Sequence, residues 1–310
     1  MHTCILLIFT RIRVVKKLNI LLLLTLVLRT GYSQKQVAIT IDDIPNVETF
    51  NRNKFSSQLL NVINAIEVPA AIFINEGNVY KNEFVAENKK GLSKWLNSPN
   101  ITAGNHGYSH LNYSDTTLAA FEEDVKKGAL ITSEALGRSP RYFRFPFNSM
   151  GNDSVAHQQV KKFLKKNKYI NTPFTIESED WVFSTAYEAA LKKNDLTKAQ
   201  QIAEMYLTYT IALFEHFEKI CLEIYGRNVR HIYLCHDNQL NADYMLELIK
   251  RLTQRGYSYI TLEEALKDKV YQTPEYYSGR FGFSWIYRWE KDEAKRKSLM
   301  KQEPSYEIVK

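Results

Sequence analysis

Two adjacent carboxylates, Asp42 and Asp43, directly follow the apolar run Val-Ala-Ile-Thr-Ile at residues 37–41. Such a run is typical of a buried strand, so the pair stands where that strand ends. Two carboxylates this close cannot both ionise freely unless a cation or a proton lies between them. The pair therefore predicts a site in which one carboxylate binds a metal ion and the other takes part in the chemistry.

Two histidines, His106 and His110, follow another apolar run at residues 101–103. Gly107 permits a tight turn between them, so that both imidazoles can converge on one ion. Surface and capping roles explain most histidine pairs with this spacing, but the aspartate pair at another strand end favours the metal interpretation. Two imidazoles and one carboxylate, with an open position for water, form a common catalytic zinc set.

An arginine and a third histidine also stand at predicted strand ends. Arg144 precedes Phe-Pro-Phe and can hold a carboxylate ionised through a bidentate contact. A surface arginine beside an edge-strand proline is the alternative. His236 follows the apolar run 231–235 and can donate a proton to a leaving group, although a lone histidine there is more often structural.

Short apolar runs alternate with amphipathic segments along the chain, as expected for strands that alternate with helices. The predicted strands are residues 37–41, 70–74, 101–103, 142–145, 169–170, 231–235 and 257–260. This alternation predicts a parallel sheet, open or closed into a barrel, and about seven strands favour a barrel-like closure. In such folds the functional side chains gather at the carboxyl ends of the strands.

Two regions interrupt this alternation. Residues 185–228 form a predicted helical insertion between the fifth and sixth predicted strands, with aromatic residues at a spacing typical of a core. Residues 271–310 are rich in Tyr, Trp, Lys and Arg and have no strand pattern. Their aromatic residues could stack on sugars, but packing against the domain is favoured. The charged end from Glu290 onward suits a solvated or frayed helix.

Residues 1–33 have the pattern of a secretory signal peptide. Basic residues precede a short apolar run from Leu18 to Leu28, and the small-residue sequence Gly-Tyr-Ser follows at 31–33. The apolar run is shorter than the roughly 20 residues of a membrane span, and an uncleaved anchor is the alternative. We therefore expect an exported protein, periplasmic or extracellular, with no stable membrane span after cleavage.

Charge and cysteine content narrow the possible partners. The five basic residues within 1–33 account for most of the formal net charge of +7, which falls to +2 without them. This near balance gives no electrostatic reason to expect nucleic acid as a partner. Beyond Cys4, the chain has Cys221 and Cys235, which an exported protein could pair. Two buried free thiols are favoured, because both cysteines stand in apolar or helical patterns.

Five short motifs occur in order between residues 40 and 236. They are Thr-Ile-Asp-Asp at 40–43, His-x-x-x-His at 106–110, Arg-Phe-Pro-Phe at 144–147, Asp-Trp at 180–181 and Leu-Cys-His at 234–236. In this order they resemble the motifs of the polysaccharide deacetylases, carbohydrate esterases with a NodB-homology domain. The resemblance implies an α/β fold, a distorted (β/α) barrel of about seven parallel strands with the helical insertion before the sixth. The expected organisation is a signal peptide at 1–33, a deacetylase-like domain at 34–270 and an aromatic, charged tail at 271–310.

The resemblance also implies roles for the residues at the first three motifs. Asp42 corresponds to the general base that activates water. Asp43, His106 and His110 correspond to the ligands of a divalent metal, most simply Zn²⁺, with Co²⁺ or Ni²⁺ as substitutes. Arg144 corresponds to the arginine that orients the base and keeps it ionised.

The remaining motifs match the groups that complete the reaction. His236 corresponds to the general acid that protonates the departing amine or alcohol, and Asp180 to the carboxylate that tunes this histidine. Trp181 and Leu234 correspond to the apolar wall around the acetyl methyl group. The backbone N–H of Phe147 is a candidate donor to the oxyanion.

The resemblance implies an acetylated glycan as substrate, with N-acetyl or O-acetyl groups on peptidoglycan, xylan or chitin-type chains. The sequence departs from the family pattern at Ile41 and Ile44, which flank the aspartate pair, and at Phe147-Asn148 after the proline. None of these departures removes a catalytic group, but they predict a differently shaped cleft. A hydrolase of a small non-sugar amide and a non-catalytic glycan-binding protein are therefore the alternatives.

Overall fold

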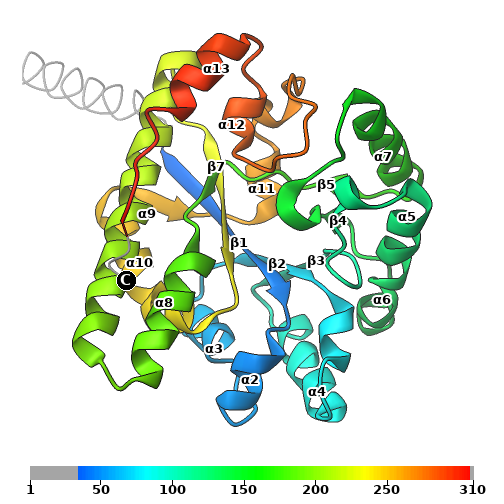
Figure 1. Cartoon of the computed structure of the whole chain (residues 1–310), viewed down its shortest axis with the longest axis vertical. Helices are drawn as coiled ribbons and strands as arrows, with labels where there is room; N and C mark the ends of the chain where they lie inside the picture. The colour runs from blue at the N-terminus through cyan, green and yellow to red at the C-terminus, as the bar shows by residue number, and fades with distance from the viewer. Residues whose placement is uncertain (1–33, 308–310) are drawn as a thin grey trace, which may run out of the picture. The chain divides into compact units, whose positions relative to one another are not determined.

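The computed structural model describes residues 34–307, and the residues from Lys35 onward form one compact unit. The predicted signal peptide at 1–33 lies outside the described residues. In this unit the strands lie in the middle, with helices around them (Figure 1). No helix among residues 34–307 is long and apolar enough to cross a lipid bilayer.

The core of the unit is one parallel sheet. Its strands are β1 (Lys35–Ile44), β2 (Ala70–Ile74), β3 (Ile101–Asn105), β4 (Tyr142–Phe143), β5 (Ile170–Asn171), β6 (Ile176–Glu177), β7 (Arg230–His236) and β8 (Tyr257–Tyr259). The order across the sheet is β5-β4-β3-β2-β1-β7-β6, and β8 pairs with the beginning of β1. All these pairs are parallel, which confirms the predicted barrel-like α/β fold.

The sheet curls but does not close, because no strand pairing joins β5 to β6 in the described part of the chain. The strand β6 was missed from sequence because Ile176 and Glu177 are too few to show a period of two. Its presence makes the strand after the helical insertion the seventh rather than the sixth.

Helices connect the strands and cover the sheet. They are α2 (Val47–Arg52), α3 (Gln58–Ala65), α4 (Val85–Leu96), α5 (Leu118–Lys127), α6 (Leu130–Leu136), α7 (Ser154–Lys166), α8 (Asp180–Lys192), α9 (Leu196–Tyr225), α10 (Gln239–Gln254), α11 (Leu262–Leu266), α12 (Trp285–Arg288) and α13 (Glu293–Met300). Short 3₁₀ turns lie at Glu76–Tyr80, Tyr113–Asp115, Pro146–Asn148 and Lys269–Gln272. Several helices begin at a side-chain cap, as at Asn238, whose side-chain Oδ1 accepts from the backbone N–H of Asn241.

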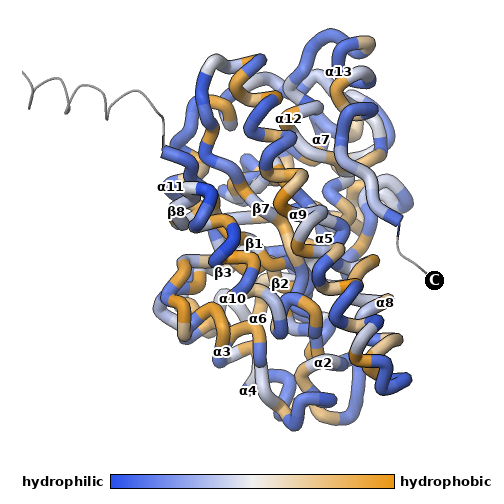
Figure 2. Tube along the Cα trace, turned by 90° about the vertical axis from the view of Figure 1, so that its left-hand side faces the viewer, coloured by the Kyte–Doolittle hydropathy of each residue, from blue (hydrophilic) through white to orange (hydrophobic). Residues whose placement is uncertain are grey.

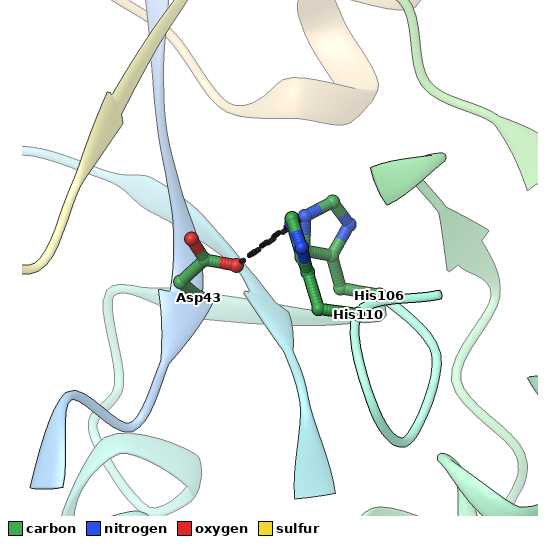
Figure 3. Close-up of side chains that lie close together, drawn as sticks. All are labelled: Asp43, His106 and His110. Carbon is green, nitrogen blue, oxygen red and sulfur yellow. Dashed lines mark ion pairs between the residues drawn. The ribbon is translucent and has the colours of Figure 1, made fainter. Parts of the chain in front are cut away.

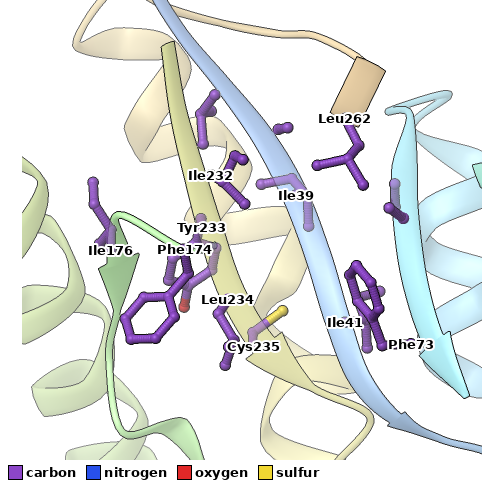
Figure 4. Packing of buried hydrophobic residues seen from close by; sticks show 14 of the residues in the cluster. Ile39, Ile41, Phe73, Phe174, Ile176, Ile232, Tyr233, Leu234, Cys235 and Leu262 are labelled. Atoms are coloured by element: carbon purple, nitrogen blue, oxygen red, sulfur yellow. The ribbon is translucent and has the colours of Figure 1, made fainter. Parts of the chain in front are cut away.

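The central strand β1 is buried from Val37 to Asp42, because it lies between β2 and β7 in the middle of the curled sheet. Figure 4 shows Ile39 and Ile41 of this strand beside Phe73 and Ile232. Along the helices, hydrophobic residues alternate with hydrophilic ones, whereas the inner strands are mostly hydrophobic (Figure 2). Cys221 and Cys235 are both buried and free.

The insertion and the C-terminal region pack on this sheet. The long helix α9 buries Tyr206 and Phe214, the latter against Tyr233 of β7. In the C-terminal region, Trp285 and Tyr287 are buried, so these rings pack on the unit. The charged end is less exposed than its sequence suggests, because α13 buries one leucine and one arginine against the rest of the unit.

Candidate metal centre and active site

Three side chains at the carboxyl edge of the sheet could hold a metal ion. Asp43 comes from the end of β1, while His106 and His110 come from the segment after β3, and the three converge as Figure 3 shows. Asp43 Oδ1 lies 3.3 Å from His110 Nε2 and 3.6 Å from His106 Nε2. This carboxylate oxygen is buried without a hydrogen-bond partner, so its lone pairs are available to a cation. The donor set therefore fits a divalent cation such as zinc.

Backbone contacts fix the two histidine ligands. His106 Nδ1 lies 2.8 Å from the carbonyl oxygen of Arg144, so that Nδ1–H donates and Nε2 keeps its lone pair toward Asp43. The Asn75 side chain donates to the carbonyl oxygens of His106 at 2.5 Å and Gly107 at 3.2 Å. The tight turn at Gly107, with φ of 75°, carries the chain back so that both rings face one point.

The protonation states of this cluster suit metal binding. Burial and the neighbouring His106 lower the pKa of His110 to about 4, so that its imidazole is neutral at pH 7. Although burial alone would raise it, the pKa of Asp43 is lowered by the adjacent His110 and His106. A neutral imidazole and an ionised carboxylate are the forms that bind metals.

The second carboxylate, Asp42, forms a buried pair with Arg144. Arg144 Nη1 donates to Asp42 Oδ1 at 2.8 Å and to Thr40 Oγ1 at 2.7 Å. The predicted bidentate contact is wrong in geometry, because Nε donates to the carbonyl oxygen of Thr172 at 3.2 Å instead. One guanidinium thus joins β1 to the segment after β5 and holds a single Asp42 oxygen.

His236, at the end of β7, lies beside Asp42 in the sheet register. Its Nδ1 is 2.7 Å from Asp180 Oδ1, at the first turn of α8, and its backbone N–H donates to Asp180 Oδ2 at 2.9 Å. Asn238 and Asn241 donate to the same Oδ2 at 2.8 Å and 2.6 Å. Burial would lower the pKa of His236, but the charge and hydrogen bond of Asp180 raise it to about 10.

These groups line one cleft of about 920 Å³. The three residues predicted to bind substrate all line this cleft: Trp181 and Phe147 are 58% and 57% exposed, and Leu234 is buried. The cleft thus brings together every site residue predicted from the sequence except Asp180 and Arg144, which stand behind His236 and Asp42.

The sequence did not reveal several cleft residues. Asn75 and Asn78 follow β2, and Asn78 donates to the carbonyl oxygen of Asp43 at 3.3 Å. Lys81 and Glu177 also line the cleft. Functional side chains gather at the carboxyl ends of parallel strands, and this strand-end rule could have found Asn75 and Glu177. Both stand at the same edge of the sheet as Asp42.

Glu177 holds a proton at neutral pH. Burial and the nearby charge of Asp180 raise the pKa of Glu177 from 4.5 to about 8. The native state therefore binds a proton that the unfolded state loses above about pH 4.5, and stability falls as the pH rises from there to about 8.

Glu177→Gln is expected to flatten this dependence, because glutamine stays neutral. Between pH 5.5 and pH 8, the free energy of unfolding in urea should fall by on the order of 1–2 kcal/mol more in the wild type than in the variant. Glu48→Gln, at an exposed glutamate of the same cleft, is the control. If the free energy of unfolding depended on pH equally in the wild type and both variants, the prediction would be contradicted.

The curled parallel α/β sheet and the Asp–His–His cluster at its carboxyl edge define the class of protein. It is a barrel-like α/β protein with a candidate metal site of the kind that hydrolases use. Residues 30–164 match the family model described as polysaccharide deacetylase. This part of the chain is therefore similar to the polysaccharide deacetylases. The similarity to this family supports a hydrolase activity on carbon–nitrogen bonds.

Several known proteins are similar to the chain. YheN of Bacillus subtilis (strain 168), whose name assigns it to the polysaccharide deacetylases, is 23% identical over 241 residues, which are 77% of this chain and 71% of YheN. The Bc1960 peptidoglycan N-acetylglucosamine deacetylase is 17% identical with a TM-score of 0.51, over 76% of this chain and 89% of that one. BA3943 of Bacillus anthracis is described as a CE4 family pseudoenzyme. It is also 17% identical with a TM-score of 0.51, over 76% of this chain and 66% of BA3943. At these identities, the structural matches establish the fold.

Proposed function

We propose that this protein is an exported, metal-dependent deacetylase that hydrolyses N-acetyl or O-acetyl groups on a glycan such as peptidoglycan or chitin-type oligomers. One observation carries the proposal: the Asp43–His106–His110 cluster and the His236 imidazole line the same cleft, with Asp42 between them in the sheet. Hydrolysis of an acetamide needs an electrophile, a base and an acid around one carbonyl, and this cleft holds candidates for all three.

The metal would be held by Asp43, His106 and His110. A divalent cation in that position supplies Lewis-acid polarisation of the acetyl carbonyl and lowers the pKa of a bound water. These three residues line the same cleft as the exposed side chain of Trp181.

The protein's own side chains then move the protons. Asp42 accepts the proton of the attacking water, because the buried Arg144 guanidinium holds its carboxylate in place through a 2.8 Å hydrogen bond. His236 donates a proton to the departing amine, because Asp180 keeps its imidazole protonated and orients it through Nδ1. Trp181 and Leu234 bound the space for the acetyl methyl group, and the N–H of Phe147 is the proposed oxyanion donor.

The substrate class rests on the relatives. The Bc1960 protein is named as a peptidoglycan N-acetylglucosamine deacetylase, which supports an acetylated glycan for this chain as well. The sequence pattern at residues 1–33 supports export to the compartment where such glycans occur. Zinc is the proposed metal, with cobalt or nickel as functional substitutes.

Acetate release tests the proposal. The purified protein is incubated with acetylated chitin oligomers, peptidoglycan fragments and acetylated xylan, with and without a chelator. We expect acetate from at least one glycan, loss to near the buffer background with chelator, and recovery when Zn²⁺ is restored. Glycan binding without acetate release under any metal would indicate a binding protein instead. Hydrolysis of small cyclic amides alone would indicate the non-sugar alternative.

A further inference from the structure

The C-terminal segment, residues 275–289, packs against residues 174–175, which connect β5 to β6. Trp285 N donates to the carbonyl oxygen of Phe174 at 3.1 Å, and Ser284 Oγ donates to that of Thr175 at 2.6 Å. The rings of Trp285 and Phe174 also pack edge to face, with centroids 5.7 Å apart. The segment is thus attached to the connection between the two edge strands of the sheet.

The same segment reaches the turn at Pro146–Asn148 through one buried arginine. Arg288 is fully buried, and its Nη1 donates to the carbonyl oxygen of Asn148 at 3.0 Å. Its Nε donates to Glu275 Oε1 at 2.7 Å, and Trp285 stacks under the guanidinium at 3.9 Å. A buried ion pair is costly to desolvate and is therefore weak evidence for stability. We therefore consider a positioning role for the contact between Arg288 and this turn.

Gly282 approaches the turn from the other direction. A Cβ at Gly282 would overlap the carbonyl oxygen of Phe147 and lie 2.6 Å from Asn148 Cβ. Gly282 lines the same cleft as the metal cluster. The absence of a side chain at this position is therefore what lets the segment close on the turn.

The turn needs this support because its backbone is strained. Phe147 and Asn148 have φ of 55° and 50°, the left-handed region that non-glycine residues adopt at a cost. Such conformations persist where the surrounding structure imposes them, and they concentrate at functional sites. Here the contacts of Arg288 and Gly282 hold the turn in this conformation.

The turn in turn contacts a proposed metal ligand. The ring of Phe147 packs edge to face on the imidazole of His110, with centroids 4.5 Å apart. His110 also has a left-handed backbone, with φ of 57°, and its side chain is 30% exposed. Its orientation therefore depends on the ring beside it.

From these contacts we infer that the C-terminal segment is a positioning element of the metal centre: Gly282 and Arg288 hold the Phe147–Asn148 turn, and Phe147 holds His110 in its ligand orientation. The inference rests on the metal site of the proposed function. It extends the site beyond residues 30–164, which the family model covers. Residues that orient metal ligands typically contribute about 10–100-fold in metal affinity.

Gly282→Ala tests the inference with Gly279→Ala as its matched control. Both glycines lie in the same segment, but a Cβ at Gly279 meets the side chain of Tyr277, with the hydroxyl oxygen at 2.5 Å, rather than the turn. We expect Gly282→Ala to weaken Zn²⁺ binding about 10-fold in chelator competition and to raise KM more than it lowers kcat. Gly279→Ala should stay within about twofold of the wild type.

A second readout does not need the metal. In ¹³C-histidine-labelled, metal-free protein, Gly282→Ala should shift the His110 ring resonances, because Phe147 changes its place over that ring, and Gly279→Ala should not. Unchanged His110 resonances in Gly282→Ala would overturn the inference. If the wild type binds no Zn²⁺, the proposed metal site is wrong. The His110 resonances of the metal-free protein would still show whether the C-terminal segment positions that ring.

Arg288→Met provides an independent variant, with Arg296→Met as control. Arg296 also donates to a backbone carbonyl, that of Glu290, but stands apart from the turn. Arg288→Met should shift the His110 resonances in the same direction as Gly282→Ala. Equal effects of Arg288→Met and Arg296→Met on the thermal midpoint, with His110 unmoved in both, would show a purely structural role.

Discussion

Asp42→Asn is expected to lower kcat for deacetylation by about 10³-fold while Zn²⁺ affinity stays near that of the wild type. The amide cannot accept the proton of the attacking water, but it leaves the Asp43–His106–His110 ligand set intact. Arg144 loses its buried charge partner, so the variant should also be less stable by up to about 3–5 kcal/mol. Acetate release, chelator competition and urea unfolding measure the three effects.

Asp43→Asn is the matched comparison, because it changes the adjacent carboxylate by the same atoms. It should lose Zn²⁺ affinity and activity together, whereas Asp42→Asn should lose activity alone. Full activity of Asp42→Asn on an acetylated sugar oligomer would exclude Asp42 as the base. Parallel loss of metal binding in both variants would assign both carboxylates to the metal.

His236→Asn is expected to have the second large effect, and the effect should depend on the leaving group. An amine leaves poorly unless it is protonated, so deacetylation of an N-acetylated sugar should fall by roughly 10²–10⁴-fold. Nitrophenolate leaves without a proton, so hydrolysis of p-nitrophenyl acetate should fall much less. The ratio of the two kcat/KM values separates loss of the acid from loss of the site.

His216→Gln is the control for this ratio. His216 is a partly buried histidine that lies near Tyr287 Oη, at 2.8 Å, away from the cleft. It should leave both activities unchanged. Equal losses on the amide and the ester in His236→Asn would mean that His236 organises the cleft rather than donating the proton.

Much of the fold could be predicted from sequence because its inner strands are apolar throughout. A run such as 70–74 is buried on both faces in a parallel sheet, so it needs no polar alternation to be recognised. The strand-end rule then grouped the candidate site residues, since parallel strands end at one edge. The short β6 escaped because two residues carry no period.

The rest of the site depends on contacts between distant segments. Asn241 lies within α10 and donates to Asp180, and Tyr206 of the insertion donates to Asn241 Oδ1 at 2.7 Å. Neither residue has a sequence pattern that distinguishes it from an ordinary helix position. Arg288 also has no distinguishing sequence pattern. Its hydrogen bond to the carbonyl oxygen of Asn148 forms only because the C-terminal segment packs beside that turn.

The hydrogen bonds around Asp180 have a consequence for the speed of proton transfer. Donors from His236, Asn238 and Asn241 surround this carboxylate, which is fully buried. Its negative charge is therefore solvated by dipoles that are already oriented when the substrate arrives. In the proposed reaction, little of this environment has to reorganise when His236 gives up its proton, because these dipoles were already oriented when the protein folded.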